Sequence, residues 1–290
     1  MNVGFHEGQA CDAVLRRIEV REGAARRNCR SPERERDAAP VELVCDVGGQ
    51  QFAFEHTGVE PFEGHVRLQN DALTHFRPLE DRLSERLPST EYIELHMPLK
   101  ATEGLRGKAL AATQDALAEY VLAKAPTLPI AKEGRYALPI HREQPSGVPF
   151  EVSLHRWPRS WHAKQFAIVQ KMDIDLEAER RARILRACEK KFPKLARWQS
   201  RGAKSILVLE DNDVQNTGDH LVAEAVLAAE KSVNCSKPDE IYLVTTFSSV
   251  WFGHVIRTGG KTYFDFEDHH GRTWEIDPAT LDDATKRGLS

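Results

Sequence analysis

Two glutamates, Glu42 and Glu55, flank a predicted β-hairpin and are the first candidates for chemistry in this chain. Residues 40–57 contain β-forming runs on both sides of Gly48-Gly49, which is typical of a two-residue hairpin turn. Counting outward from the glycines places Glu42 opposite Glu55, with Cβ atoms about 5 Å apart. Like charges at this distance are destabilising, so we expect a compensating cation, and a divalent ion with oxygen ligands suits that role. Thr57 projects from the same face as Glu55.

Helices are predicted on both sides of this hairpin. An apolar stripe at helical spacing in residues 11–18 predicts a first helix, and Glu7 lies four residues before Cys11 on the same stripe. Glu19 and Glu22 are alternatives to Glu7 as the functional acid of this helix, and a further interpretation is that all three are solvated helix charges.

A second helix is predicted after the hairpin, followed by a strand. Its apolar stripe runs through residues 72–87, and extending the stripe backwards places His65 and Gln69 on the side packed against the sheet. Gln69 is therefore a candidate for an auxiliary role, or a polar residue satisfied by backbone. Residues 92–97 predict a strand that closes this unit, and the first strand of the sheet is expected near residues 26–30.

The acids and their spacing resemble the motif of the PD-(D/E)XK nuclease superfamily. In that motif an acid near the start of one strand precedes an acid-x-Lys tripeptide on the next. Here Glu42 takes the first position, twelve residues follow, and Glu55-His56-Thr57 stands for the tripeptide. The sequence departs from the motif in two places, because Glu42 replaces the usual Asp and Thr57 replaces the usual Lys.

The resemblance implies an α/β fold with a restriction-endonuclease-like core (helix, β-meander, helix, strand) followed by a C-terminal α/β region. It also implies that Glu42 and Glu55 hold Mg²⁺ or Mn²⁺, that Glu7 orients a water molecule and that Gln69 assists. A threonine hydroxyl is neither basic nor cationic, so Thr57 can only hydrogen-bond the attacking water, and another group must activate it. The expected function is a metal-dependent nuclease acting on DNA or, as second choice, RNA. The alternative is an inactive module of the same fold that binds nucleic acid or a protein partner.

A basic segment is the predicted contact with nucleic acid. Residues 180–204 contain ten basic residues and one acid, Glu189. The same segment has apolar residues at helical spacing, so we expect a helix with its basic side chains on the solvent face, where they could bind phosphates. A solvated helix without a ligand has the same pattern. The candidate nucleic-acid-binding residues are Lys190, Lys191, Lys194 and Arg197.

A competing metal site is suggested further along the chain. Glu210, Asp211 and Asp213 follow the apolar run 205–209, which predicts a strand buried on both faces, and ligands bind at such strand ends in α/β folds. Acids between a strand and a helix are also ordinary loop and cap residues.

Composition and length set broader limits. The formal net charge of −4 over 290 residues excludes an overall basic nucleic-acid coat protein. The five cysteines form no CxxC pair and no apolar stretch has the length of a membrane span, so we expect reduced thiols, a cytoplasmic location and no membrane partner. The predicted domains are a nuclease-like core over 1–100, a helical and Pro-rich insertion over 101–172, and a basic helix with the C-terminal α/β region over 173–290, which either continues the same sheet or forms a separate domain.

Overall fold

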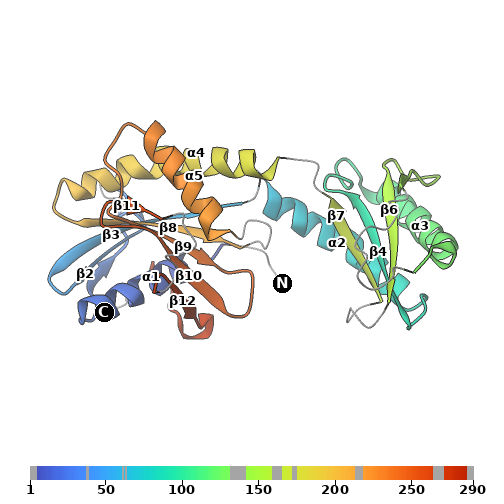
Figure 1. Cartoon of the computed structure of the whole chain (residues 1–290), viewed down its shortest axis with the longest axis horizontal. Helices are drawn as coiled ribbons and strands as arrows, with labels where there is room; N and C mark the ends of the chain where they lie inside the picture. The colour runs from blue at the N-terminus through green and yellow to red at the C-terminus, as the bar shows by residue number, and fades with distance from the viewer. Residues whose placement is uncertain are drawn as a thin grey trace. The chain divides into compact units, whose positions relative to one another are not determined.

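The computed structural model describes residues 5–36, 39–60, 62, 64–130, 142–158, 165–171, 175–212, 218–263 and 271–285. The chain is a mixed α/β protein that divides into two compact units. Val3–His65 and Asp175–Ser290 form the first unit, and Val66–Ile174 form the second (Figure 1). Among the described helices, none is both long enough and apolar enough to cross a lipid bilayer.

The first unit is built on a mixed sheet with the order β1-β2-β3-β8-β9-β10-β11, and β12 pairs with β10. β1 to β3 form an antiparallel meander, β8 runs parallel to β3, β9 runs parallel to β8, and β10 is antiparallel to β9. The strands are β1 (Arg27–Arg30), β2 (Leu43–Val47), β3 (Gln50–Gly58), β8 (Lys204–Asp211), β9 (Glu240–Thr245), β10 (Trp251–Thr258), β11 (Lys261–Thr262) and β12 (Thr273–Ile276).

The turn between β2 and β3 has the geometry that its two glycines predict. Gly48 and Gly49 have φ values of 60° and 84°, which only glycine adopts readily. The pairing runs from Val47 opposite Gln50 to Leu43 opposite Phe54, so the predicted hairpin register is confirmed.

Helices cover both faces of this sheet (Figure 1). α1 (Glu7–Glu22) packs on one face, and α4 (Leu176–Gln199) and α5 (Asp219–Ser232) pack on the other. Because side chains alternate along a strand, Glu55 faces the side of α4, whereas His56 faces the side of α1. The core on the α1 side includes Leu15, Ile18, Leu43, Phe54, Ile206 and Val208, and the core on the other side includes Phe192, Val226, Leu207, Leu209 and Ile241.

α4 is the predicted basic helix. Its first turn is capped by Asp175, whose carboxylate accepts hydrogen bonds from the N–H groups of Glu177 and Ala178. Ile184, Cys188, Phe192 and Leu195 are fully buried at helical spacing, so this stripe fixes the rotation of the helix against the sheet.

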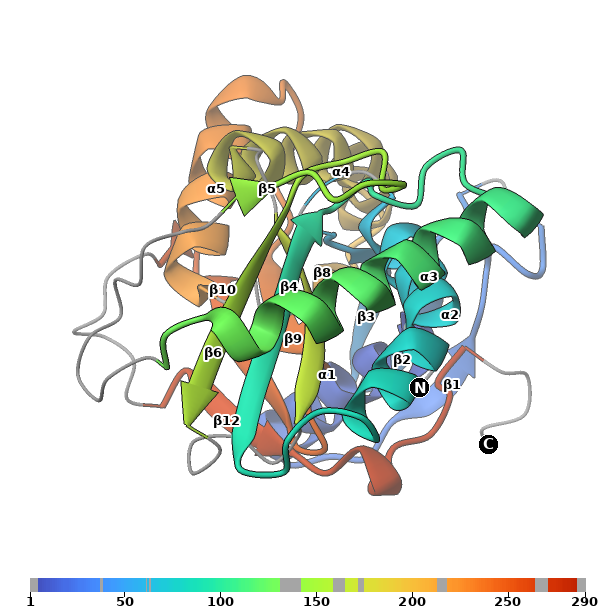
Figure 2. The same cartoon turned by 90° about the vertical axis from the view of Figure 1, so that its right-hand side faces the viewer.

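The second unit is a four-stranded sheet with helices packed on one face. The sheet order is β5-β6-β4-β7, with β6 antiparallel and β7 parallel to β4. Apolar residues of β4, β6 and β7 form one core with α2 and α3, and Figure 2 shows α3 lying across β4 and β6. The elements are α2 (His65–Ser84), β4 (Glu91–Pro98), α3 (Gly107–Lys124), a 3₁₀ turn (Ala125–Thr127), β5 (Arg142–Glu143), β6 (Val152–Pro158) and β7 (Phe166–Lys171).

The predicted second helix and closing strand form, but they belong to this second unit. The strand beside β3 is β8, and the helix that precedes it is α4. The cause lies in the side chains: residues 205–209 are buried on both faces, as a central strand requires, whereas β4 alternates apolar residues with Glu94 and His96. The predicted boundary at residue 100 therefore lies inside the second unit, and residues after 175 continue the sheet of β1 to β3.

Candidate functional site

Glu42 and Glu55 lie side by side, as the hairpin register predicts. Glu42 directly precedes β2 and is 9 % exposed, and Glu55 is on β3 and fully buried. Glu33, in the loop between β1 and β2, adds an exposed third acid, and its backbone N–H donates to the carbonyl of Val41 at 3.0 Å. One carboxylate oxygen from each of the three glutamates lies within 4.8 Å of the others. This cluster has the residue types and spacing of an oxygen-ligand cation site.

Two lysines of α4 supply positive charge at this pair. Lys191 Nζ lies 2.7 Å from Glu42 Oε1 and 2.5 Å from Glu55 Oε2. Lys194 Nζ lies 2.9 Å from Glu55 Oε1, and the two lysines share a helix face because they are three residues apart. Two ammonium groups therefore compensate the paired carboxylates, and the sequence, from which a divalent ion was expected in this role, did not predict them.

The prediction that Lys191 and Lys194 line the solvent face of α4 is wrong. Lys191 is buried and Lys194 is half-buried, because both lie on the flank of the stripe that packs on the sheet. Lys190 and Arg197 are exposed, as predicted. A helical projection places Lys191 at the edge of the apolar stripe, next to Ile184, and this position in the pattern indicates that it faces inward.

The backbone of β3 also contacts the pair. The N–H of His56 donates a hydrogen bond to Glu42 Oε2. Glu55 Oε1 has Lys194 Nζ at 2.9 Å as its close partner among the described residues, and a carboxylate oxygen has two lone pairs. One buried carboxylate oxygen thus has spare capacity for a ligand.

Burial and neighbouring charges shift the pKa values of Glu42 and Lys191. Burial, and then the charge of Glu55, raise the pKa of Glu42 to about 7, against the opposing effect of Lys191. Burial lowers the pKa of Lys191, but the charges of Glu42 and Glu55 outweigh it and raise that pKa. Lys191 is therefore a cation at neutral pH, whereas Glu42 exchanges a proton near neutrality.

The remaining candidate residues are not brought into this cluster. Glu7 is exposed in the first turn of α1, a helix that packs on the opposite face of the sheet, so the prediction that it lies on the buried stripe is wrong. Thr57 is half-buried two residues beyond Glu55, and no hydrogen bond between it and either glutamate is found among the described residues. The side chain of Gln69 lies outside the described residues.

The alternative acids of α1 have other partners. Glu19 pairs with Arg26 at 2.8 Å, and Glu22 pairs with Arg21 at 3.0 Å. Burial raises the pKa of Glu19, but hydrogen bonds from Arg26 lower it overall. Glu19 therefore connects α1 to the chain that follows it, whereas Glu22 forms an exposed ion pair within the helix.

A second buried acid, Glu210, lies on the α1 face at the end of β8. Its carboxylate accepts hydrogen bonds from the His6 N–H at 2.8 Å and from Thr246 Oγ1 at 2.9 Å, and it lies 2.9 Å from His56 Nε2 and 3.0 Å from His6 Nδ1. Burial opposes ionisation, yet the bonds to His56 and His6 lower the pKa of Glu210 to about 2. Among the described residues Glu210 joins no cluster of three metal-ligating side chains, and Asp213 of the predicted competing site lies outside them.

Comparison with family models, curated proteins and solved structures gave no match.

Proposed function

We propose that this chain is a metal-dependent phosphodiesterase that cleaves nucleic acid, with DNA as the first candidate substrate and RNA as the second, and with Glu42 and Glu55 at its centre. The observation that carries the proposal is the buried carboxylate pair, Glu42 directly before β2 and Glu55 on β3, with an ammonium group, Lys191 Nζ, within 2.7 Å of both. The element order also supports it. A helix, a three-stranded meander, a helix and a parallel strand follow one another once α4 and β8 take the places predicted for α2 and β4.

The donor atoms fit a hard divalent cation. Glu33, Glu42 and Glu55 offer clustered carboxylate oxygens, the ligands that Mg²⁺ and Mn²⁺ prefer, and Glu55 Oε1, which lies 2.9 Å from Lys194 Nζ, has a second lone pair for a ligand. These three residues would hold the ion. When bound, it would neutralise charge on the scissile phosphate and acidify a water molecule. Glu33 is exposed, so the cluster is open to solvent on its side.

Lys191 takes the place of the lysine that the motif lacks at Thr57. Its ammonium reaches the acid pair from α4 instead of from β3. Because the charges of Glu42 and Glu55 raise its pKa, Lys191 donates hydrogen bonds and does not accept a proton from water. Its role in this proposal is electrostatic, to stabilise the negative charge that develops on the phosphate.

Cleavage assays on the full chain test the proposal. Supercoiled plasmid, single-stranded DNA and RNA are incubated with Mg²⁺ or Mn²⁺, and we expect cutting that Glu55→Gln reduces by at least about a hundredfold. Glu22→Gln is the matched control, because it removes the same charge from an exposed position. Circular dichroism establishes that each variant is folded. A wild type that is inert on every substrate with both metals, or a Glu55→Gln variant that cuts at the wild-type rate, contradicts the proposal.

A DNA-binding assay, run beside the cleavage assay, separates the enzyme from an inactive binding module. Thr57 in place of lysine and the exposed Lys190 and Arg197 on α4 favour that second function. In this case the wild type binds labelled DNA in the presence of a chelator, the affinity falls steeply with salt, and no cutting follows on addition of metal.

A further inference from the structure

The four-stranded sheet of the second unit carries polar and charged side chains on the face that α2 and α3 do not cover. Arg142 lies opposite Ser153, Ser153 lies opposite His96, and Lys171 lies opposite Pro98, two residues beyond His96. Residues opposite each other on neighbouring strands project from the same face. The alternating residues, among them Leu95 and Leu154, belong to the core with the two helices. Side chains from four strands thus gather on one face.

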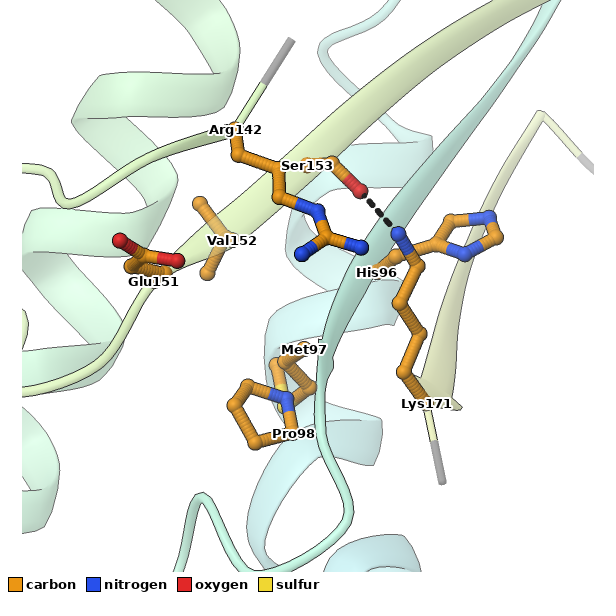
Figure 3. Close-up of a pocket in the computed structure, with 8 residues that line it drawn as sticks. All are labelled: His96, Met97, Pro98, Arg142, Glu151, Val152, Ser153 and Lys171. Carbon is orange, nitrogen blue, oxygen red and sulfur yellow. Dashed lines mark hydrogen bonds between the residues drawn. The ribbon is translucent and has the colours of Figure 1, made fainter. Parts of the chain in front are cut away.

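These side chains surround a small pocket of about 60 Å³. Figure 3 shows the guanidinium of Arg142 and the ammonium of Lys171 both directed into it. Lys171 Nζ donates a hydrogen bond of 2.7 Å to Ser153 Oγ, and Ser153 is 2 % exposed. The lining residues are His96, Met97, Pro98, Arg142, Glu151, Val152, Ser153 and Lys171.

The charge in this pocket is predominantly positive. Glu151, the acid among the lining residues, is exposed, and Figure 3 shows its carboxylate beyond Val152, away from Lys171. Arg142 has no ion pair among the described residues. Near the pocket, burial and then the charges of His96 and Lys171 lower the pKa of His155, which disfavours the protonated form of this histidine.

We propose that this pocket binds a phosphate group. An arginine offers a planar pair of N–H donors that matches two oxygens of a phosphate, and a lysine adds a compact charge. Because an ammonium group can only donate, Ser153 Oγ is the acceptor of the Lys171 bond, and this bond holds the lysine at the pocket; the same hydroxyl also lies 3.4 Å from His155 Nε2. A single water molecule needs roughly 10–15 Å³ of such space, so the pocket has room for a group of a few heavy atoms. The pocket belongs to the second unit and the Glu42–Glu55 pair to the first, and phosphate binding does not depend on nuclease activity.

Calorimetric titration of the full chain with inorganic phosphate tests this site. The titration is run with a chelator and at constant ionic strength, balanced with sodium chloride. We expect saturable binding of one phosphate per chain. Arg142→Gln and Lys171→Gln should each weaken binding by about tenfold, the value of one charge-assisted hydrogen bond. Arg106→Gln is the matched control, because Arg106 is exposed in the same unit and does not line the pocket.

Each outcome of the titration bears on the proposal. Absence of saturable binding overturns it, and so does equal weakening in all three variants, which would indicate a general charge effect. If Lys171→Gln does not fold, the exposed Arg142 still decides the question.

Oligonucleotides with and without a 5′-phosphate identify the source of the phosphate group in the same assay. A preference for the 5′-phosphorylated strand, lost in Arg142→Gln, indicates a terminal phosphate. Equal binding of both strands that also depends on Arg142 indicates a backbone phosphate. Binding of inorganic phosphate alone indicates the free ion, and each of these three results supports a phosphate site.

Discussion

Glu42 and Glu210 are buried glutamates of the same unit, yet their surroundings have opposite effects. Burial raises the pKa of both side chains. At Glu42 the charge of Glu55 adds to burial, the two together outweigh the opposing effect of Lys191, and the pKa rises to about 7. Glu210 is surrounded by donors from His6, His56 and Thr246, and its pKa falls to about 2. Glu210 is therefore ionised at neutral pH and held by hydrogen bonds within the fold, whereas Glu42 depends on a neighbouring cation for its charge. An acid of the second kind is suited to a site that exchanges cations.

The largest effect is expected from removing the cation between Glu42 and Glu55. Lys191→Met leaves two buried carboxylates with Lys194 as the remaining close cation, and breaking a buried pair in this way costs about 3–5 kcal/mol. Urea denaturation at pH 8 measures the loss as a lower free energy of unfolding. At pH 5 the loss should be smaller, because Glu42 then takes up a proton.

Lys190→Met is the matched control for this experiment. Lys190 is the exposed neighbour of Lys191 on α4, and a surface substitution of this kind changes the free energy of unfolding by less than about 0.5 kcal/mol. Equal losses in the two variants would show that the charge of Lys191 does not compensate the acid pair.

A smaller effect is expected at Glu210, with the opposite dependence on pH. The difference between about 2 and the ordinary pKa of 4.5 corresponds to roughly 3 kcal/mol. Because this pKa is lowered in the folded state, the stabilisation is present above about pH 4.5 and is lost as pH falls through 2. Glu210→Gln should cost roughly 2–3 kcal/mol at pH 7 and little at pH 2, as measured by urea denaturation at both values. A cost that does not change with pH would show that packing, not charge, is what Glu210 contributes.

The acid pair could be predicted from the sequence because its determinants are local. Gly48-Gly49 fixes the turn, the turn fixes the register, and the register places Glu42 beside Glu55. The same reasoning predicts that a compensating cation is needed, but not which residue supplies it. Lys191 comes from a helix that begins more than a hundred residues later in the chain. The position of Lys191 beside the acid pair depends on how α4 packs against the sheet, and the residues of the hairpin do not specify that packing.

The order of the sheet was harder to predict for a related reason. Residues 92–97 follow the hairpin closely in sequence, and proximity in sequence favours pairing with the nearest strand. The structure instead places β8 beside β3, after the whole second unit. The distinguishing signal was present in the pattern, because residues 205–209 are apolar throughout whereas β4 alternates with polar residues.

The smallest effect, and the most specific, concerns the competition between protons and Mg²⁺ at Glu42. A carboxylate must lose its proton to bind the ion, so with a pKa of about 7 we expect the apparent Mg²⁺ affinity to rise by up to about tenfold per pH unit below 7 and to level off above it. Thermal unfolding at a series of Mg²⁺ concentrations between pH 6 and pH 8 measures this affinity. Glu42→Gln should abolish the pH dependence, and Glu210→Gln should retain it, because Glu210 is fully ionised throughout this range. If Glu210→Gln abolishes the pH dependence and Glu42→Gln retains it, the ion binds at Glu210, on the α1 face of the sheet, and not at Glu42.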